Sequence, residues 1–377
     1  MKNRLFAPGP TMVSEDTLAA VGRAPMHHRS EEFKQLYREV IENLSYVYQT
    51  AGHPLLLNAS GSGAMESCVA NLFRRGDRVA VVVAGWFGRR WRDIAKAYGL
   101  EVLCYEIPDT EGTDPDAFAK WFASQGKVRG LLLTHCETST GAFHDVRAVA
   151  ERIRDKDVLL VVDAVTSLGV HEVKTDAWGL DAVVCGSQKA LMCPPGVSMV
   201  SLSEKAWRAV EESDLPKYYF DYVANRESAE KKSQPRFTVA TSIVAGLAVS
   251  LRRIREEGIE AIIARHERLG AATRAGVCAL GLRLFSSSPC NAVTAVLPPD
   301  KIEVEKIRGV LLGEHGIRVA GGQGNLQGKI FRIGHLGYYD RFDVLTVLGA
   351  LEAALSSLGF AAASGAAVSA AQEAWGH

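Results

Sequence analysis

The sequence predicts an α/β protein whose large domain has a mostly parallel sheet flanked by helices, followed by a small α+β domain. From residue 14 to about residue 200, short apolar runs alternate with amphipathic, helix-like stretches, which is the pattern of a doubly wound sheet. Most of these runs are continuously apolar, which is typical of parallel strands covered on both faces. After residue 282, shorter strand-like and helix-like segments indicate the second domain.

The elements follow in order along the chain. The first 13 residues include Pro8-Gly9-Pro10 and are expected to form an extended N-terminal arm without regular structure. The large domain is assigned to residues 14–258. Within it we expect helices at 64–73, 88–98 and 145–155, and strands at 79–83, 101–107, 129–134, 158–163 and 181–185.

Residues 242–281 are rich in Ala, Leu, Ile, Arg and Glu, and Gly258 is the one break in their helical pattern. They predict two consecutive helices that lead out of the large domain. The small domain is assigned to residues 259–377, including the connecting helix. It is expected to contain strands at 292–297 and 329–333 and helices at 303–314 and 341–357. The tail from Phe360 to His377 has weak periodicity and is expected either to extend the last helix or to be frayed.

Composition excludes several classes of function. The chain of 377 residues carries 43 Lys+Arg and 43 Asp+Glu, so nothing in its charge favours nucleic acid or an anionic membrane surface. Its seven cysteines form no CxxC pair, which argues against a zinc site, an iron–sulfur cluster or a disulfide framework and favours reduced thiols in the cytoplasm. No apolar signal segment and no apolar run of about 18 residues is present, so neither secretion nor a membrane span is expected.

Two charged residues stand at the carboxyl ends of expected strands. Lys189 ends the run that begins at Ala182, and Asp163 ends the run that begins at Val158. This edge is where open α/β sheets bind ligands. A lysine amine that forms an imine and an aspartate that holds a protonated ring nitrogen are the two groups that a pyridoxal phosphate (PLP) site needs. Taken alone, Lys189 also fits a lysine that merely reaches solvent.

Other segments near strand ends carry polar or aromatic side chains. Ser62 lies in a Gly/Ser loop that opens an expected helix, where N–H groups and the helix dipole favour an anion. Trp86 and Phe87 follow the strand at 79–83 and are placed to stack on a planar cofactor. Thr138 belongs to three successive hydroxyl residues that suit hydrogen bonds to a polar ligand. Each feature alone also fits a tight turn, a core aromatic or a Ser/Thr-rich turn.

Arg332 is a single charged residue inside the apolar strand Phe331-Arg332-Ile333-Gly334. A buried or half-buried guanidinium needs an anion. The partner is either a structural carboxylate or the carboxylate of a bound amino acid, which the planar fork of arginine fits in a bidentate manner.

Taken together and in this order, the segments resemble the class V (fold type I) PLP-dependent aminotransferases, and most of all the alanine–glyoxylate / serine–pyruvate aminotransferase branch. The resemblance extends over almost the whole chain. It rests on Pro8-Gly9-Pro10-Thr11, Ser60-Gly61-Ser62-Gly63-Ala64-Met65-Glu66, Glu137-Thr138-Ser139-Thr140-Gly141, Val162-Asp163-Ala164-Val165-Thr166-Ser167, Gly186-Ser187-Gln188-Lys189-Ala190 and Arg332-Ile333-Gly334-His335-Leu336-Gly337. It implies a large domain of the seven-stranded type, a PLP cofactor and an aminotransferase with ping-pong half-reactions. The implied substrates are a small amino acid (alanine, serine or aspartate) and a small 2-oxo acid (glyoxylate or pyruvate).

The resemblance also implies roles for individual residues. Lys189 carries the cofactor as an imine (a Schiff base) and then moves the proton between the substrate Cα and the cofactor, and Asp163 pairs with the pyridinium nitrogen. Thr138 hydrogen-bonds the phenolic oxygen of the ring, and Phe87 stacks on its face, with the adjacent Trp86 as a competitor. The phosphate is bound by Ser62, Gly63, Ala64, Gln188 and, from the neighbouring subunit, Thr238.

On the substrate side, the resemblance implies Arg332 for the α-carboxylate, and Gly9, His28 and Arg29 near the substrate. No metal is expected. The run His27-His28-Arg29 also fits a solvated edge before an N-cap at Ser30. Because Thr238 is useful only if it faces a neighbour's phosphate, a homodimer with shared active sites is expected. The family often has Thr-Pro where this chain has Thr238-Val239.

Three alternatives remain beside this assignment. A phosphoserine-type class V aminotransferase differs in only a few substrate contacts. A cysteine desulfurase needs a nucleophilic cysteine on a mobile loop before the small-domain arginine, and the loop at 320–328 contains none. From another class, an electron-transfer subunit of a soluble hydrogenase needs a redox metal or cluster, for which the cysteine spacing offers no ligand set.

Overall fold

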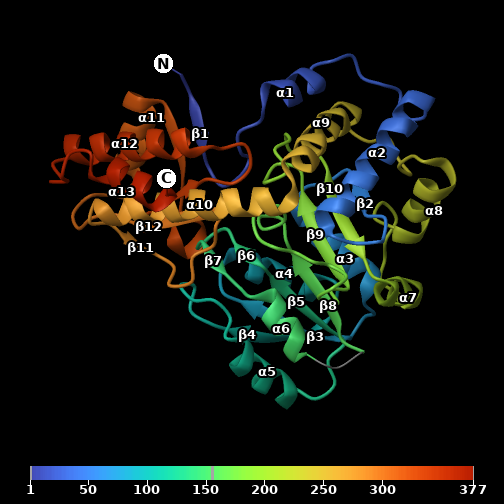
Figure 1. Cartoon of the computed structure of the whole chain (residues 1–377). Helices are drawn as coiled ribbons and strands as arrows, with labels where there is room; N and C mark the ends of the chain where they lie inside the picture. The colour runs from blue at the N-terminus through green and yellow to red at the C-terminus, as the bar shows by residue number, and fades with distance from the viewer. Residues whose placement is uncertain (1, 154–156, 377) are drawn as a thin grey trace.

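A seven-stranded sheet and a five-stranded sheet organise the chain into a large and a small domain (Figure 1). The computed structural model describes residues 2–153 and 157–376. The large sheet has the order β2-β10-β9-β8-β5-β3-β4, in which β10 runs antiparallel to both of its neighbours and the remaining pairs are parallel. In this spatial order the strands span Leu55–Leu57, Ser198–Leu202, Ala182–Gly186, Leu159–Asp163, Gly130–Thr134, Arg78–Val83 and Glu101–Glu106.

The five expected strands of the large domain are confirmed to within one residue, as β3, β4, β5, β8 and β9. Alternate residues of each inner strand face different layers. In β3, Ala80 and Val82 join one hydrophobic cluster, whereas Val79 and Val81 join the cluster on the opposite face. Burial on both faces is why these strands are continuously apolar in sequence.

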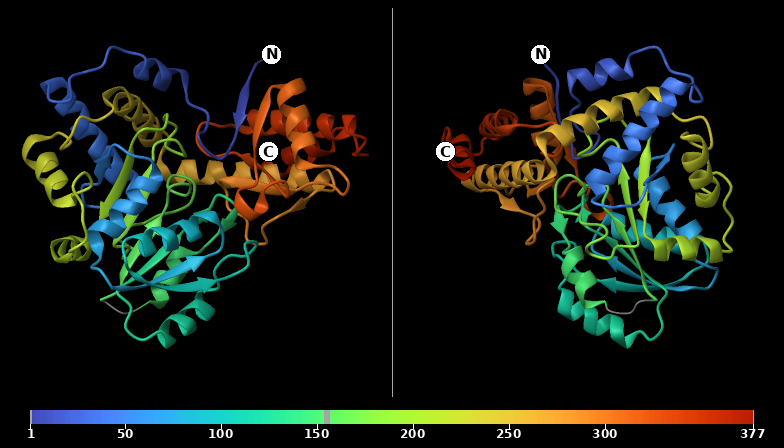
Figure 2. Two further views of the ribbon diagram at one scale, coloured as in Figure 1. Left: turned by 180° about the vertical axis from the view of Figure 1, so that it is seen from behind. Right: turned by 45° about the vertical axis from the view of Figure 1, so that its right-hand side comes forward.

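Helices cover both faces of this sheet (Figure 2). One face packs against α2 (Glu31–Tyr48), α5 (Pro115–Ser124), α6 (Val146–Arg152) and α9 (Thr241–Glu257). The other packs against α3 (Gly61–Leu72), α4 (Trp86–Ala97), α7 (Glu204–Glu212) and α8 (Tyr222–Lys232). A short helix, α1 (Glu15–Val21), packs on α9.

Two of the three expected helices begin earlier than the sequence indicated, and the third begins one residue later. The helix expected at 64–73 is α3, which starts at Gly61 and so holds Ser62 and Gly63 in its first turn. The helix expected at 88–98 is α4, whose first turn contains Phe87. The helix expected at 145–155 is α6, which ends at Arg152, and residues 154 and 155 lie outside the described part of the chain.

The break expected at Gly258 is confirmed: this residue has φ +86° and separates α9 from α10 (Ile259–Ala279). Figure 1 shows α10 running from the large domain to the small one. We propose that the boundary between residues 14–258 and residues 259–377 lies at this break.

The small sheet has the order β1-β13-β14-β12-β11, and its strands span Arg4–Phe6, Ile317–Gly321, Phe331–Gly334, Val293–Leu297 and Arg283–Leu284. The expected strands at 292–297 and 329–333 are therefore confirmed. The expectation of no regular structure in the first 13 residues was wrong for residues 4–6, which pair in parallel with β13. Phe6 is buried in the core of the small domain, and this tertiary contact outweighs the turn signal of the following prolines.

Helices α11 (Val304–His315) and α12 (Arg341–Ser357) confirm the two helices expected in the small domain. The tail was wrongly expected to extend α12 or to fray. Residues 366–375 instead form a separate helix, α13, which buries Ala367 and Ala371 against α10. The connection contains Gly359 and Gly365, both with positive φ, which explains why α12 does not continue.

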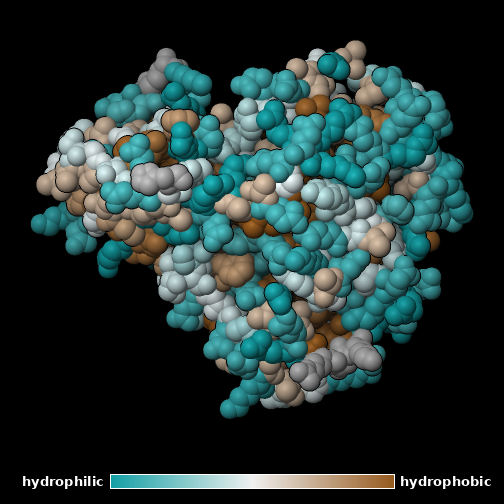
Figure 3. Space-filling model, viewed as in Figure 1, coloured by the Kyte–Doolittle hydropathy of each residue, from teal (hydrophilic) through white to brown (hydrophobic). Residues whose placement is uncertain are grey.

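The face of the molecule shown in Figure 3 is mostly hydrophilic over the large domain and paler over the Ala-rich helices of the small domain. Large apolar side chains that are exposed there and elsewhere are scattered, such as Tyr218 and Phe342. Among the described helices, none has the length and apolar character that a bilayer crossing requires.

Candidate active site

The carboxyl ends of β8 and β9 bring Asp163 and Lys189 into one buried site. Asp163 is the last residue of β8, paired in register with Thr134 of β5 and Val184 of β9. Lys189 follows the end of β9 by three residues. Asp163 is only 4% exposed and Lys189 only 8%. The charge of each side chain shifts the pKa of the other. Both residues therefore lie at the carboxyl edge of the sheet, where the sequence placed them.

The amine of Lys189 is held in a partly desolvated, cationic environment. Burial, together with the positive charge of Arg332, lowers the pKa of Lys189 to about 8 against the opposing effect of Asp163. A lysine with such a pKa is partly neutral near neutral pH, and only the neutral amine is nucleophilic.

The N-terminal segment lies directly on Lys189. Its Nζ donates a hydrogen bond of 2.7 Å to the main-chain oxygen of Pro8. A Cβ atom added at Gly9 would lie 2.2 Å from the same nitrogen, so only glycine permits this approach. Thr11 donates from its hydroxyl to the main-chain oxygen of Lys189 at 3.1 Å. Gly9, expected near the substrate, therefore contacts the lysine itself.

Asp163 is a buried carboxyl group with few neutralising contacts. Burial raises its pKa to about 6, despite a hydrogen bond that the main-chain N–H of Val165 donates to it at 2.9 Å. The positive charges of Arg90 and Lys189 also lower this pKa, whereas Glu137 raises it. Such a carboxylate gains most from a cationic partner, which in this position would be a protonated ring nitrogen.

Arg332 extends from β14 of the small domain into the same site and is 5% exposed. Its guanidinium donates to neutral oxygens: the main-chain oxygens of Gly321 (2.7 and 2.9 Å) and Thr138 (2.8 Å), and Oε1 of Gln323 (3.3 Å). Burial lowers its pKa to about 10, while the charge of Glu137 acts in the opposite direction. No carboxylate among the described residues forms an ion pair with this cation, so its charge calls for an anionic ligand.

Thr138 lies between Arg332, which it contacts through its main chain, and the loop after Asp163, which it contacts through its hydroxyl. Its Oγ1 lies 2.5 Å from Oγ1 of Thr166, and its main-chain oxygen accepts from Arg332. Because Thr166 follows β8 shortly after Asp163, the hydroxyl of Thr138 is held close to the loop that carries the aspartate.

Glu137 is a functional residue that the sequence analysis did not single out. It is 1% exposed and accepts hydrogen bonds from the main-chain N–H groups of Phe87 (2.9 Å), Gly88 (3.0 Å) and Ser139 (3.1 Å). The N-cap of α4, Gly85, has no capping side chain, so this carboxylate replaces it. The sequence did contain a signal for Glu137, because this charged residue directly precedes the three hydroxyl residues Thr138-Ser139-Thr140.

Phe87 and Trp86 occupy different surroundings, although they are neighbours in sequence. The Phe87 ring lies under the guanidinium of Arg90, whose carbon is 4.6 Å from the ring centroid. Trp86 is 39% exposed and packs against Gly324 of the small domain, where an added Cβ would meet its ring at 2.6 Å. The position of Trp86 at this contact favours Phe87 as the residue that faces the site.

Three of the residues expected around a phosphate, Ser62, Gly63 and Ala64, lie in the first turn of α3. The N-cap of α3, Ser60, makes no side-chain capping bond, so the first turn of this helix keeps its N–H groups for another acceptor. Ser62 accepts a hydrogen bond of 2.6 Å from Arg90. At Gly63, a Cβ would lie 2.7 Å from Ala59, so the turn is too tight for a side chain. Ala64 is fully buried just behind it.

Gln188, also expected at the phosphate, follows β9, the strand on which α3 packs. Its Oε1 is buried and has no hydrogen-bond partner among the described residues. Oxygen and nitrogen of such an amide can exchange places by rotation, which turns an acceptor into two donors. An unpartnered buried amide beside Lys189, together with the open helix terminus, fits the phosphate group of PLP.

Thr238, His28 and Arg29 lie apart from this group. Thr238 is exposed, and its Oγ1 is 3.5 Å from Nε2 of His28. Arg29 is exposed as well. Within one chain the structure gives these three residues no contact with Lys189, Asp163 or Arg332.

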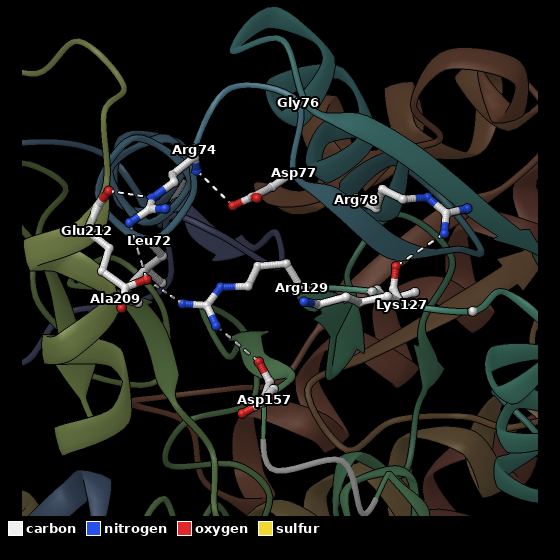
Figure 4. A pocket seen from close by; sticks show the side chains of 12 residues that line it. Leu72, Arg74, Gly76, Asp77, Arg78, Lys127, Arg129, Asp157, Ala209 and Glu212 are labelled. Atoms are coloured by element: carbon white, nitrogen blue, oxygen red, sulfur yellow. Dashed lines mark hydrogen bonds and ion pairs between the residues drawn. The ribbon is translucent and has the colours of Figure 1, made fainter.

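A cavity of about 860 Å³ lies elsewhere, at the amino-terminal ends of the parallel strands (Figure 4). Its lining includes Arg74, Arg78 and Arg129, but these cations face carboxylates. Arg74 and Arg129 both pair with Glu212, at 3.6 and 3.3 Å. It contains none of the expected site residues, so its volume alone does not mark the active site.

The structure does not support a cysteine desulfurase or an electron-transfer subunit of a hydrogenase. Within residues 2–153 and 157–376, no three His, Cys, Asp or Glu side chains are grouped so as to hold a metal ion. Cys290, the cysteine nearest to the small-domain arginine before the loop at 320–328, is fully buried.

Comparison with known proteins identifies the family of this chain. The family model for class-V aminotransferases matches residues 11–334. The L-aspartate–glyoxylate aminotransferase of Paracoccus denitrificans is 34% identical over 99% of this chain and 96% of that protein. The crystal structure of ureidoglycine–glyoxylate aminotransferase from Bacillus subtilis is 30% identical, with a TM-score of 0.95 over 100% of this chain and 99% of that one.

A relative from Anabaena cylindrica, 42% identical over 95% of this chain and 94% of that protein, carries the name soluble hydrogenase 42 kDa subunit. The name suggests the electron-transfer function considered above, yet the similarity extends over nearly the same length of this chain as that of the aminotransferases. The family match, the glyoxylate aminotransferases and the site geometry agree with one another. This chain therefore belongs to the class-V aminotransferases and is a PLP-dependent aminotransferase of fold type I.

Proposed function

We propose that the enzyme transfers the amino group of a small amino acid (alanine, serine or aspartate) to glyoxylate or pyruvate in two ping-pong half-reactions. Relatives named for aspartate–glyoxylate and serine–glyoxylate transamination, 34% and 32% identical, support this choice of substrates. The observation that carries the proposal is the burial of Lys189 in one site with Asp163 and Arg332, whose charges both act on its amine.

Each of these three groups has a distinct task in the proposed reaction. PLP, when bound, supplies an electron sink for the electrons released when the Cα–H bond of the amino acid breaks. Lys189 attaches the cofactor through Nζ and, once released as a neutral amine, takes up and returns the Cα proton. Asp163 keeps a proton on the ring nitrogen, since a buried carboxylate stabilises a neighbouring cation. Arg332 orients the substrate by binding its α-carboxylate.

The surrounding residues hold these groups in place. Thr138 is proposed to hydrogen-bond the phenolic oxygen of the ring, and Phe87 to stack on its face, positioned by Glu137. Ser62, Gly63, Ala64 and Gln188 are proposed to bind the phosphate. Gly9 gives the N-terminal segment its close approach to Lys189.

The pairing of a neighbouring arginine bears on the choice between small donors and phosphoserine. A second small-domain arginine, Arg308, lies near enough to lower the pKa of Arg332. However, it donates to both carboxylate oxygens of Glu305, at 2.7 and 2.5 Å. An arginine neutralised in this way is a poor receptor for a distal phosphate, which disfavours the phosphoserine-type alternative.

We also propose a homodimer with shared active sites in the cytoplasm. Thr238, His28 and Arg29 have no contact with the Lys189 site of their own chain, which is expected if they serve the partner's site. Seven free cysteines, of which five are buried, suit a reducing compartment.

The test is a half-reaction screen of the purified holoenzyme. Alanine, serine, aspartate and phosphoserine are added singly, and loss of the absorbance of the Lys189-linked cofactor is followed by stopped flow. Glyoxylate and pyruvate are then tested for recovery of that absorbance. We expect the fastest loss with one of the three small donors. If phosphoserine reacts fastest, the substrate proposal is wrong.

A further inference from the structure

The proposed phosphate cradle lacks a cation. Ser62, Gly63, Ala64 and Gln188 all offer neutral donors, and so does Thr238, which is proposed to reach the cradle from the neighbouring chain. A phosphate monoester carries a charge of about −1.5 to −2 at neutral pH. Neutral donors and a helix terminus can bind such a group, but a cation within hydrogen-bond reach offsets its charge far better.

Arg90 places a guanidinium at this cradle. It lies on α4, three residues after Phe87, and its Nη1 donates a hydrogen bond of 2.6 Å to Oγ of Ser62. The residue is half-buried. No carboxylate of the described residues forms an ion pair with Arg90, in contrast to the preceding Arg89, which pairs with Asp109 at 2.7 Å.

The charge of Arg90 also acts within the site. It lowers the pKa of Asp163 and that of Lys189, although burial remains the largest influence on both. Its guanidinium carbon lies 4.6 Å from the centroid of the Phe87 ring, and stacking on an aromatic face fixes the orientation of an arginine. The cation is therefore held by two residues that are themselves proposed to contact the cofactor.

We propose that Arg90 is the counter-cation of the cofactor phosphate, bound to it directly or through the Ser62 hydroxyl. This inference rests on the proposed function of the site and adds to it a residue of this chain that anchors the cofactor. The alternative that the experiment must distinguish is that the guanidinium covers the Phe87 ring where the cofactor ring is proposed to stack, and leaves when the cofactor binds.

The experiment separates these roles by using two ligands that differ in the phosphate alone. Apoenzymes of the wild type, Arg90→Gln and Arg90→Lys are titrated with PLP and with pyridoxal, and dissociation constants are measured by fluorescence quenching. Arg92→Gln is the matched control, because Arg92 lies on the same helix and pairs with the exposed Asp93. Circular dichroism of each apoenzyme verifies that the variants fold.

Loss of one charged hydrogen bond should weaken PLP binding by Arg90→Gln about 10- to 150-fold. Pyridoxal binding should change by less than about threefold, Arg90→Lys should be intermediate, and Arg92→Gln should match the wild type. Inorganic phosphate should compete with PLP for the wild-type apoenzyme and much less for Arg90→Gln.

Equal weakening for PLP and pyridoxal would place Arg90 at the ring or in the fold. Unchanged or tighter PLP binding would mean that the guanidinium is displaced by the cofactor. Either result overturns the inference while wild-type transamination still supports the proposed function. A wild-type enzyme that binds PLP but fails the half-reaction screen would refute the proposed function instead. If Arg90→Gln does not fold, Arg90→Lys decides the question by its ratio of PLP to pyridoxal affinity.

Discussion

The Nζ atom of Lys189 donates a hydrogen bond of 2.7 Å to the main-chain oxygen of Pro8, although the two residues are 181 positions apart in sequence. Pro8 follows β1, which belongs to the sheet of the small domain. The N-terminal segment thus passes from that sheet over the lysine of the large domain. This contact makes the chemistry of Lys189 sensitive to a segment that has no reactive side chain.

Gly9→Ala should therefore abolish cofactor attachment. The added Cβ would lie 2.2 Å from Nζ of Lys189, and Gly9 has φ +150°, which L residues rarely adopt. We expect loss of the cofactor absorbance with the circular dichroism spectrum retained. Gly179→Ala is the control, because Gly179 also has positive φ (+66°) but an added Cβ there meets nothing within 4 Å. Normal cofactor loading in Gly9→Ala would show that the segment moves freely.

The pH dependence of cofactor attachment should report the lowered pKa of Lys189. Only the neutral amine attacks, so the rate of PLP attachment to the apoenzyme should rise about tenfold per pH unit and level off above about pH 8. Asp163 raises this pKa and Arg332 lowers it. The midpoint should consequently move down in Asp163→Asn and up in Arg332→Gln. Stopped-flow absorbance measures each profile, and shifts of the same sign in both variants would contradict the electrostatic account.

Asp163→Ala should leave the cofactor attached but slow transamination by at least about 10²-fold, the scale of losing a positioned acid–base or electrostatic group. The reason is that an unprotonated ring nitrogen makes a poor electron sink. Steady-state kinetics measures the loss, and borohydride reduction with peptide mapping shows whether the cofactor still occupies Lys189. Turnover near that of the wild type would mean that another group protonates the ring.

Arg332→Ala should lower kcat/KM for every amino acid while preserving cofactor absorbance. A charged hydrogen bond is worth about 1.5–3 kcal/mol, or roughly 10- to 150-fold. Arg332→Lys keeps the charge but loses the fork, so its loss should lie towards the lower end. Arg308→Lys is the control, since Glu305 neutralises that arginine. Unchanged kcat/KM in Arg332→Ala would make Arg332 structural.

Shared active sites can be tested by mixing two inactive chains. Lys189→Ala removes the attachment point, and Thr238→Glu places a negative charge where the partner's cofactor phosphate is proposed to lie. When the two variants are refolded together, about half of the dimers contain one chain of each kind. Each of these mixed dimers has one intact site of its two, so about one quarter of wild-type activity should return. Each variant refolded alone is the control. No recovery, despite dimers in sedimentation, would place Thr238 at its own chain's site.

Much of the fold was readable from the sequence because local patterns carried it. The inner strands of the large sheet are apolar at consecutive positions, since both faces are covered, and this made β3, β5, β8 and β9 recognisable. Gly258 marked a helix boundary by its conformational freedom alone. Strands β1 and β2, with three residues each, and the two-residue strands β6 (Cys136–Glu137) and β7 (Ala142–Phe143) are too short to produce such a pattern.

Some residues of the candidate site were likewise recognisable from sequence, and others were not. Lys189, Asp163 and Arg332 were found because a charged residue at the end of an apolar strand, or inside one, is conspicuous along the chain. Glu137 and Arg90 were missed, since a carboxylate that caps α4 and an arginine that faces Ser62 look like ordinary polar residues until the chain is folded.

By itself, the sequence determined the α/β architecture, the strand ends that carry the reactive groups and the resemblance to an aminotransferase family, because each depends on periodicity or on residues close in sequence. Only the tertiary structure decided that β1 joins the small domain, that Pro8 and Gly9 touch Lys189 and that Arg332 reaches the large domain. The hydrogen bond between Arg332 and Thr138 spans 194 positions, and the pairing of Arg4 with Ile317 spans still more. Their formation depends on burial and backbone hydrogen bonding in the assembled domains, and no local pattern records them.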